Sequence, residues 1–223
     1  ITVNSSSPGF QANRDFILRF KLADDQISSG LMTHNGDEEN FFLINIQPPA
    51  RVIPSQIPAR EYLFVIDVSG SMHGFPLNTA KKLFEQLSKT LRPIDQFNIQ
   101  CFSGGSQFLS KQPLAATGTN IRRAHTMLNN LSGRGGTNLN KALKESLAMS
   151  SNNDLSRNVI VITDGYIGAD QQTFQIIRDN RNNANIFSFG IGSSVNRHLI
   201  EGMAKVGGGE PFVVTQPKEA YRI

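Results

Sequence analysis

The chain has 223 residues, of which 39% are hydrophobic and 18% charged, so it can bury one large core with a smaller unit attached. Lys and Arg outnumber Asp and Glu by 22 to 18, a formal net charge of +4, and these basic residues are scattered along the sequence. We therefore expect no nucleic-acid partner, and we expect no membrane insertion because no apolar run approaches roughly 18 residues.

The first expected elements are β-strands. Alternating apolar and charged side chains over residues 15–22 predict a half-buried strand, and residues 29–33 predict a second, short one. A third strand is expected over 41–47, after the Asn-Gly hairpin signal in the polar turn 35–40. Residues 1–48 thus read as a small antiparallel β extension, which is too small to be stable alone.

Residues 49–60 are rich in proline and predict a stiff, extended linker. From residue 61 the pattern changes to alternating strands and helices. This alternation predicts one α/β domain over 61–223, with a doubly wound, mostly parallel, Rossmann-like sheet flanked by helices. The expected strands are 61–67, 96–102, 107–109, 158–163, 185–191 and 211–215. The expected helices are 76–91, a segment capped by Thr119 or Asn120 and ending near 131, 139–147, 170–181, 195–206 and the start of one at 218–223.

The single cysteine, Cys101, lies in the apolar run of the expected strand 96–102. One cysteine excludes an internal disulfide and any zinc site built on several cysteines. We interpret Cys101 as a small buried hydrophobic residue and not as a nucleophile.

The expected strand 61–67 ends abruptly in oxygen-bearing side chains, Asp67, Ser69 and Ser71. In open parallel sheets, ligands bind outside the carboxyl ends of the strands. Carboxylate and hydroxyl oxygens suit a hard divalent cation such as Mg²⁺, Mn²⁺ or Ca²⁺. The sequence therefore predicts a cation site at the end of this strand.

Two further loops carry oxygen ligands of the same kind. Thr137 lies in the glycine-rich loop 133–138, and Asp164 directly follows the expected strand 158–163. If the strands 61–67 and 158–163 are neighbours where the strand order reverses, all three loops converge. Two carboxylates would then balance a divalent cation, which keeps an exchangeable position for an anionic ligand from outside.

These three segments together resemble the von Willebrand factor type A domain with its metal-ion-dependent adhesion site. They run from Asp67 to Met72, from Gly135 to Leu139 and from Thr163 to Gly165, and the resemblance covers about residues 60–223. All five positions of the family's site match without substitution. They are Asp67, Ser69, Ser71, Thr137 and Asp164.

The resemblance implies that Ser69, Ser71 and Thr137 contact the metal directly, while Asp67 and Asp164 reach it through water. It also implies that the Asp or Glu side chain of a protein partner completes the shell. The expected cation is Mg²⁺, with Ca²⁺ or Mn²⁺ as alternatives. The implied function is adhesion-type protein binding by a monomeric domain that is not an enzyme; the alternative is a structural surface domain whose metal only stabilises the loops.

The N-terminal part is similar to inter-alpha-trypsin inhibitor heavy-chain proteins and their bacterial relatives, in which a VIT domain precedes this region. The similar segments are Asp15 to Phe20 and Phe41 to Ile46, the latter followed by Gln47-Pro48-Pro49. This implies an extracellular or cell-surface protein, and the cysteine-poor composition favours a bacterial one. Because the chain begins without Met or a visible signal peptide and stops inside an expected helix, we expect it to be a piece of a longer protein.

Other chemistries fit the same residues less well. The loop 133–138 lacks the Gly-Lys-Ser/Thr ending of a phosphate-binding loop, and no Gly-x-Ser-x-Gly elbow surrounds Ser69 or Ser71. Phosphotransfer to Asp67 would need a carboxylate at position 69. The histidine nearest in sequence, His73, is interpreted as a rim residue.

Three more residues near the site carry expectations. Met72 and Phe75 are expected to pack beneath the loop that follows the strand 61–67. Tyr166, after the predicted ligand Asp164, is a candidate rim residue that would influence which partner binds.

Overall fold

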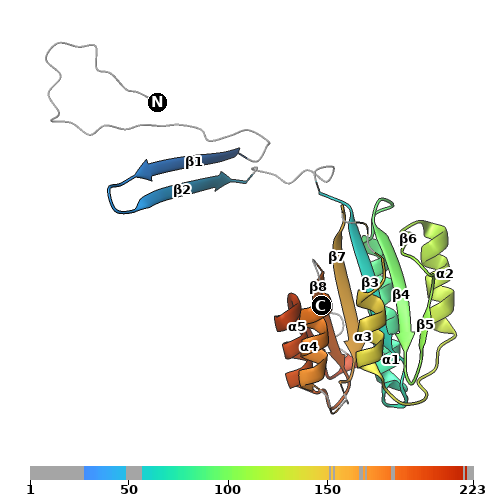
Figure 1. Cartoon of the computed structure of the whole chain (residues 1–223). Coiled ribbons are helices and arrows are strands. Elements are labelled where there is room, and N and C mark those ends of the chain that lie inside the picture. Colours follow the sequence, from blue (N-terminus) through green and yellow to red (C-terminus); the bar gives the residue numbers. More distant parts are fainter. Residues whose placement is uncertain are drawn as a thin grey trace, which may run out of the picture. The chain divides into compact units, whose positions relative to one another are not determined.

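The computed structural model describes residues 28–48, 57–150, 152, 154–165, 168, 170–181, 184–217 and 219. The chain forms two compact units, one on each side of the bond between Ile57 and Pro58 (Figure 1). The predicted strand 15–22, most of the proline-rich linker and the end of the last predicted helix lie outside the described residues.

The first unit contains an antiparallel hairpin of β1 (Ser28–Asn35) and β2 (Asn40–Gln47). Its turn is closed by a hydrogen bond from the Gly36 N–H to the Glu39 carbonyl oxygen (3.0 Å). Both strands were predicted at these places, within a few residues at each end.

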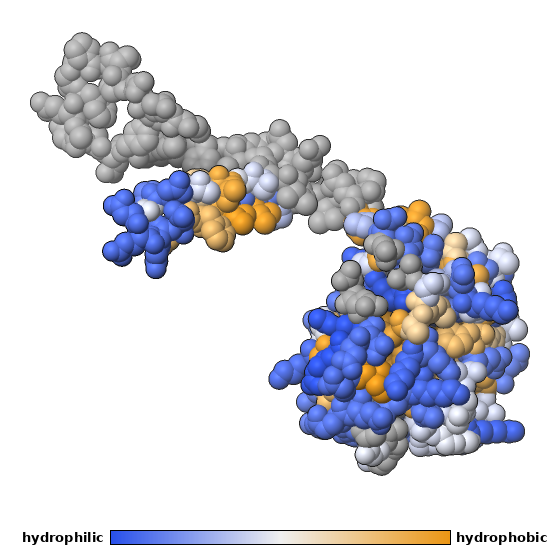
Figure 2. Space-filling view, viewed as in Figure 1, coloured by the Kyte–Doolittle hydropathy of each residue, from blue (hydrophilic) through white to orange (hydrophobic). Residues whose placement is uncertain are grey.

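Apolar side chains stand on both faces of this hairpin. Leu31 lies opposite Ile44 and Met32 lies opposite Leu43, and consecutive pairs along a strand point to opposite faces. All four residues are more than half exposed, and Figure 2 shows hydrophobic surface along the hairpin. A hairpin of two strands is only marginally stable by itself in water.

The second unit is built on a seven-stranded sheet of order β5-β4-β3-β7-β8-β9, in which β6 pairs with β4 (Figure 1). The strands are β3 (Arg60–Asp67), β4 (Gln96–Phe102), β5 (Ser106–Phe108), β6 (Leu114–Ala115), β7 (Ser156–Thr163), β8 (Asn185–Ile191) and β9 (Gly208–Val214). β5 and β6 run antiparallel to β4, and the other pairs are parallel. The strand order reverses at β3, which lies between β4 and β7. The predicted doubly wound, mostly parallel sheet is confirmed.

Helices cover both faces of this sheet. They are α1 (Phe75–Thr90), α2 (Gly118–Asn129), α3 (Leu139–Leu147), α4 (Asp170–Asn180) and α5 (Arg197–Gly207). Side chains of β3 alternate between the two layers: Phe64 and Ile66 pack in the core with α1 and α2, whereas Leu63 and Val65 pack with α3, α4 and α5. Because β3 is buried on both faces, its sequence is a continuous apolar run. No helix among the described residues is long and apolar enough to cross a membrane.

The start of α2 was predicted at the wrong residue. The Thr117 side chain accepts a hydrogen bond from the Asn120 N–H and caps the helix, whereas the sequence suggested Thr119 or Asn120 itself as the cap. Several hydroxyl and amide side chains in a row can each serve as a cap, so the pattern does not separate them. The two-residue strand β6 was not predicted, since two residues show no periodicity.

The junction of α5 and β9 was also placed imprecisely. The strand was predicted to begin at Pro211, but it begins at Gly208, directly after the helix. Gly208 ends the helix with a left-handed φ of 70°. A Cβ on Gly209 would lie 2.3 Å from the Ile186 carbonyl oxygen, so the absent side chain allows the two backbones to approach.

Asp95 holds the turn between α1 and β4. Its Oδ1 accepts a hydrogen bond from the Arg60 N–H (3.0 Å), and its Oδ2 accepts one from the Arg92 N–H (2.8 Å). The Arg92 guanidinium also contacts Oδ1 at 2.8 Å, and the carboxylate is almost fully buried. Burial acts to raise the pKa of Asp95, but the hydrogen bonds from Arg92 and Arg60 outweigh it and lower the pKa.

Asp95→Asn is expected to lower the free energy of unfolding by about 2 kcal/mol at pH 7, because charge-assisted hydrogen bonds are lost. A lowered pKa gives stability that is present above the unfolded pKa, about 3.9, and is lost as the pH falls through the folded value. The difference between the two proteins should therefore shrink below about pH 4. Urea unfolding at several pH values measures it, with the exposed Asp154→Asn as control; a difference that is constant with pH would contradict the assignment.

Candidate metal centre

Two carboxylates meet where the strand order reverses. Asp67 is the last residue of β3, and Asp164 directly follows the neighbouring strand β7. Both side chains are buried, with exposed fractions of 0% and 3%. The Thr163 hydroxyl donates a 2.7 Å hydrogen bond to Asp67 Oδ2 and joins the two strand ends.

Asp67 lies in an environment that disfavours its negative charge. Burial raises the pKa of Asp67, hydrogen bonds from Thr163 and Ser69 oppose this, and the nearby charge of Asp164 raises the pKa further. No Lys or Arg of the described chain forms an ion pair with Asp67. A divalent cation would supply the missing positive charge, so the residues present fit such a group.

The loop after β3 brings two hydroxyls together beside Asp67. The Ser69 N–H donates to Asp67 Oδ1 (2.8 Å), which turns the chain back toward the carboxylate. The residues Gly70–Met72 then form a single 3₁₀ turn, and the hydroxyl oxygens of Ser69 and Ser71 lie 3.1 Å apart. Ser69 is buried and Ser71 is exposed, so the hydroxyl pair spans from the interior to the surface.

The glycine-rich loop that carries Thr137 is fastened to the loop after β3. The Gly70 N–H donates to the Gly135 carbonyl oxygen (3.0 Å), and the Arg134 N–H donates to the Val68 carbonyl oxygen (2.8 Å). Gly135 has a φ of +81°, a left-handed conformation that glycine adopts without strain. The half-buried Thr137 thus lies in a loop whose backbone is tied directly to the serine loop.

On the other side, the loop before α5 supports Asp164. The Asn196 N–H donates to the Asp164 carbonyl oxygen (3.2 Å), while the Asn196 side chain caps α5 by accepting from the Leu199 N–H. The contributions of Thr163 and Asn196 were missed from the sequence. The position of Thr163 directly before a predicted ligand was an available signal, whereas Asn196 was recognisable only as a helix cap.

The clusters of three or more His, Cys, Asp or Glu side chains that hold many metals are absent from the described residues. A cation at the end of β3 would therefore depend on hydroxyl and water ligands in addition to the two aspartates. Such a hydroxyl-rich donor set suits hard cations such as Mg²⁺.

The residues near the candidate centre differ in how deeply they are buried. Met72 is fully buried and Phe75 half-buried, and both pack in the core beneath the loop as predicted. His73 is exposed, and Tyr166 lies outside the described residues. The hydroxyl partner of Ser69 is another serine and not a histidine. The serine–histidine hydrogen bond that the described residues do contain joins α1 and α2, away from this edge of the sheet.

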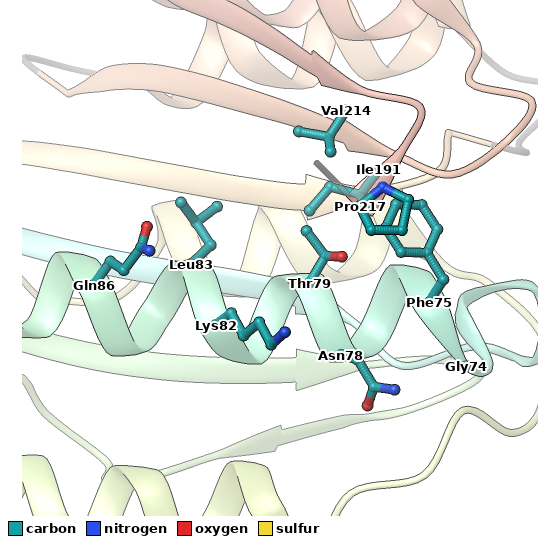
Figure 3. A pocket seen from close by; sticks show the side chains of 10 residues that line it. All are labelled: Gly74, Phe75, Asn78, Thr79, Lys82, Leu83, Gln86, Ile191, Val214 and Pro217. Carbon is teal, nitrogen blue, oxygen red and sulfur yellow. The ribbon is translucent and has the colours of Figure 1, made fainter. Parts of the chain in front are cut away.

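A cavity of about 370 Å³ lies beside α1 and is lined by residues of this helix from Phe75 to Gln86 (Figure 3). Phe75, at the start of the helix, lines it together with Leu83 and Pro217. Ile191 and Val214 line it from the ends of β8 and β9. The lining also includes the polar side chains of Asn78, Thr79 and Gln86, but it contains no carboxylate and none of the five proposed ligands, so the cavity is separate from the candidate centre.

The chain is similar to a known family over most of its length. A family model of the von Willebrand factor type A domain matches residues 60–211. A von Willebrand factor A domain-containing protein of Dictyostelium discoideum is 29% identical over 171 residues, which are 76% of this chain and 18% of that protein. Inter-alpha-trypsin inhibitor heavy chain 4 of Mus musculus is 30% identical over 210 residues, 88% of this chain and 21% of that protein. The chain thus spans about a fifth of the length of these relatives.

Solved structures share the fold at low sequence identity. A von Willebrand factor type A protein from Catenulispora acidiphila has a TM-score of 0.67 and 16% identity, covering 96% of this chain and 49% of that one. Proximal thread matrix protein 1 from the mussel byssus, solved with a zinc-occupied MIDAS motif, has a TM-score of 0.61 and 17% identity. That match covers 74% of this chain and 46% of that one.

Proposed function

This chain belongs to the von Willebrand factor type A domain family, and on that premise we propose that it is a monomeric module that binds a protein partner through a divalent cation. The observation that carries the proposal is the buried Asp67 carboxylate, which has no basic partner among the described residues and lies beside Asp164 and the serine hydroxyl pair. This adhesion-type function is the one that the family resemblance implies, and we propose it for this chain.

In the proposed centre, Ser69, Ser71 and Thr137 would contact the cation, while Asp67 and Asp164 would balance its charge through water. When bound, Mg²⁺ (or Ca²⁺ or Mn²⁺) supplies a position that accepts a carboxylate from outside. Asp67 orders the serine loop because it accepts the Ser69 N–H, and burial of the two aspartates excludes bulk water from their side of the centre. We propose binding and not catalysis, since neither the Ser69 nor the Ser71 hydroxyl has a histidine as hydrogen-bond partner within the described residues.

The proposal also covers the cellular location of the protein and the division of the chain into parts. We propose an extracellular or cell-surface location, supported by the similarity to an inter-alpha-trypsin inhibitor heavy chain. We also propose a β extension over 1–48 and a linker over 49–60 before the domain 61–223. The separation of two compact units between Ile57 and Pro58 supports this division.

The test is a calorimetric titration of Mg²⁺ into the metal-free chain, followed by binding to an immobilised peptide that presents one Asp. We expect one cation per chain, and peptide binding that disappears with EDTA or when the peptide's Asp is replaced by Asn. A cation that raises the melting temperature without any Asp-dependent binding would favour the structural alternative. Absence of cation binding would contradict both.

A further inference from the structure

Two arginines flank the candidate centre. We propose that Arg134 and Arg197 select a partner whose coordinating carboxylate lies within a cluster of acidic residues. This inference rests on the proposed function, and it names the chemistry of the partner that the surface around the cation would prefer.

Arg134 is fixed next to the serine loop. Its N–H donates to the Val68 carbonyl oxygen, and the following residue, Gly135, accepts the Gly70 N–H. The backbone of Arg134 is therefore held beside the chain that carries the two serine hydroxyls. The side chain is exposed, and its neighbours in the loop, Gly133, Gly135 and Gly136, carry no side chains.

Arg197 is placed on the other side of the centre. It is the first residue of α5 and follows Asn196, whose N–H donates to the Asp164 carbonyl oxygen. β8 precedes this loop and lies beside β7, whereas the loop of Arg134 adjoins β3 and the end of β4. A positive charge at a helix N-terminus opposes the helix dipole. The charge of Arg197 therefore does not stabilise its own helix.

Neither arginine is engaged within the part of the chain that the structure describes. Other arginines are used internally: Arg92 pairs with Asp95 and Arg157 with Glu61, each at 2.8 Å. No ion pair or side-chain hydrogen bond involves Arg134 or Arg197 in those same residues. Their charges are therefore available to a partner.

The surroundings compensate these charges only in part. Asp170 lies near Arg197, because its carboxylate accepts hydrogen bonds from the side chain of the preceding residue, Asn196, at 3.3 and 3.4 Å. A Cβ added to Gly104, Gly105 or Gly136 would meet nothing within 4 Å, so this part of the rim is open backbone. With a divalent cation balancing Asp67 and Asp164, the two arginines outnumber Asp170 and would leave a net positive rim. A partner with one carboxylate would leave that rim uncompensated, whereas a partner with several would pair with it.

The test compares two synthetic peptides on the full chain at saturating Mg²⁺. One carries a single Asp flanked by Gly and Ser, and the other carries the same Asp flanked by Asp and Glu. Two exposed ion pairs predict about tenfold tighter binding of the second peptide. This preference should vanish in Arg134→Gln/Arg197→Gln and weaken strongly in 0.5 M NaCl, where the Debye length is only about 4 Å.

The control variant is Lys111→Gln/Lys205→Gln, which removes the same charge from two exposed lysines outside these loops and should keep the preference. Equal affinity for both peptides, with Mg²⁺ binding intact, would overturn the proposal for the rim alone. Failure of the unmodified chain to bind Mg²⁺ would overturn the proposed function itself, and the rim proposal with it. Tighter binding of a heparin fragment than of either peptide, independent of Mg²⁺ and lost in the arginine variant, would overturn the acidic-protein partner in favour of a sulfated glycan.

Discussion

Asp67→Ala is expected to abolish Mg²⁺ binding while leaving the fold intact. Asp67 supplies half of the negative charge at the proposed centre, and its Oδ1 holds the Ser69 N–H and thereby the serine loop. Its removal leaves one carboxylate to balance a doubly charged cation and frees the hydroxyl pair of Ser69 and Ser71. Calorimetric titration of Mg²⁺ into both proteins measures the effect directly.

The same loss should appear in thermal unfolding. A ligand at 100 times its dissociation constant stabilises the folded state by about 2.7 kcal/mol, which in a chain of this size corresponds to roughly 5–10 °C in melting temperature. We expect this shift with Mg²⁺ in the unmodified protein and none in Asp67→Ala.

The metal-free proteins provide the control for folding. Asp67→Ala loses hydrogen bonds from Ser69 and Thr163, but it also removes a buried charge that burial and Asp164 disfavour. These effects oppose each other, so the metal-free melting temperatures should lie within a few degrees, corresponding to about 1 kcal/mol. Exposed Asp154→Asn should retain the full Mg²⁺ shift. Undiminished Mg²⁺ binding by Asp67→Ala would place the cation elsewhere.

The sheet was predictable because β3, β7 and β8 are apolar on both faces, and each ends at or directly before a carboxylate or a glycine. Burial on both faces produces a signal that is local in sequence. The hairpin was less well anticipated. Its strands were correctly placed, but the continuous run Phe41 to Ile44 exposes apolar side chains on both faces, and this exposure was not predicted.

The assembly of the site could be predicted only in outline. Oxygen side chains at strand ends are visible in the sequence, whereas the bonds from Gly70 to Gly135 and from Arg134 to Val68 join backbone groups. Every residue carries such groups, so they leave no trace in side-chain pattern. Gly133 is the indirect signal, because it marks where the two loops approach too closely for a Cβ.

Gly133→Ala should therefore weaken Mg²⁺ binding by about tenfold or more, although it changes no proposed ligand. A Cβ at this position would lie 2.8 Å from both the His73 nitrogen and the Ser69 carbonyl oxygen, and these are backbone atoms that cannot rotate away. The two loops must separate, which disturbs the bond between Gly70 and Gly135. Overpacking of this kind costs about 1–3 kcal/mol, and 1.4 kcal/mol is tenfold in affinity.

Gly136→Ala is the matched control, three residues further along the same loop. Its Cβ would meet nothing within 4 Å, and Gly136 is not among the glycines with positive φ. Its Mg²⁺ affinity should stay within about twofold, since open surface substitutions usually change free energies by less than 0.5 kcal/mol. Calorimetry on both variants separates a requirement for close loop contact from a general sensitivity of the glycine-rich loop. Equal effects of the two substitutions would contradict close packing of Gly133 against the serine loop as the source of the site's geometry.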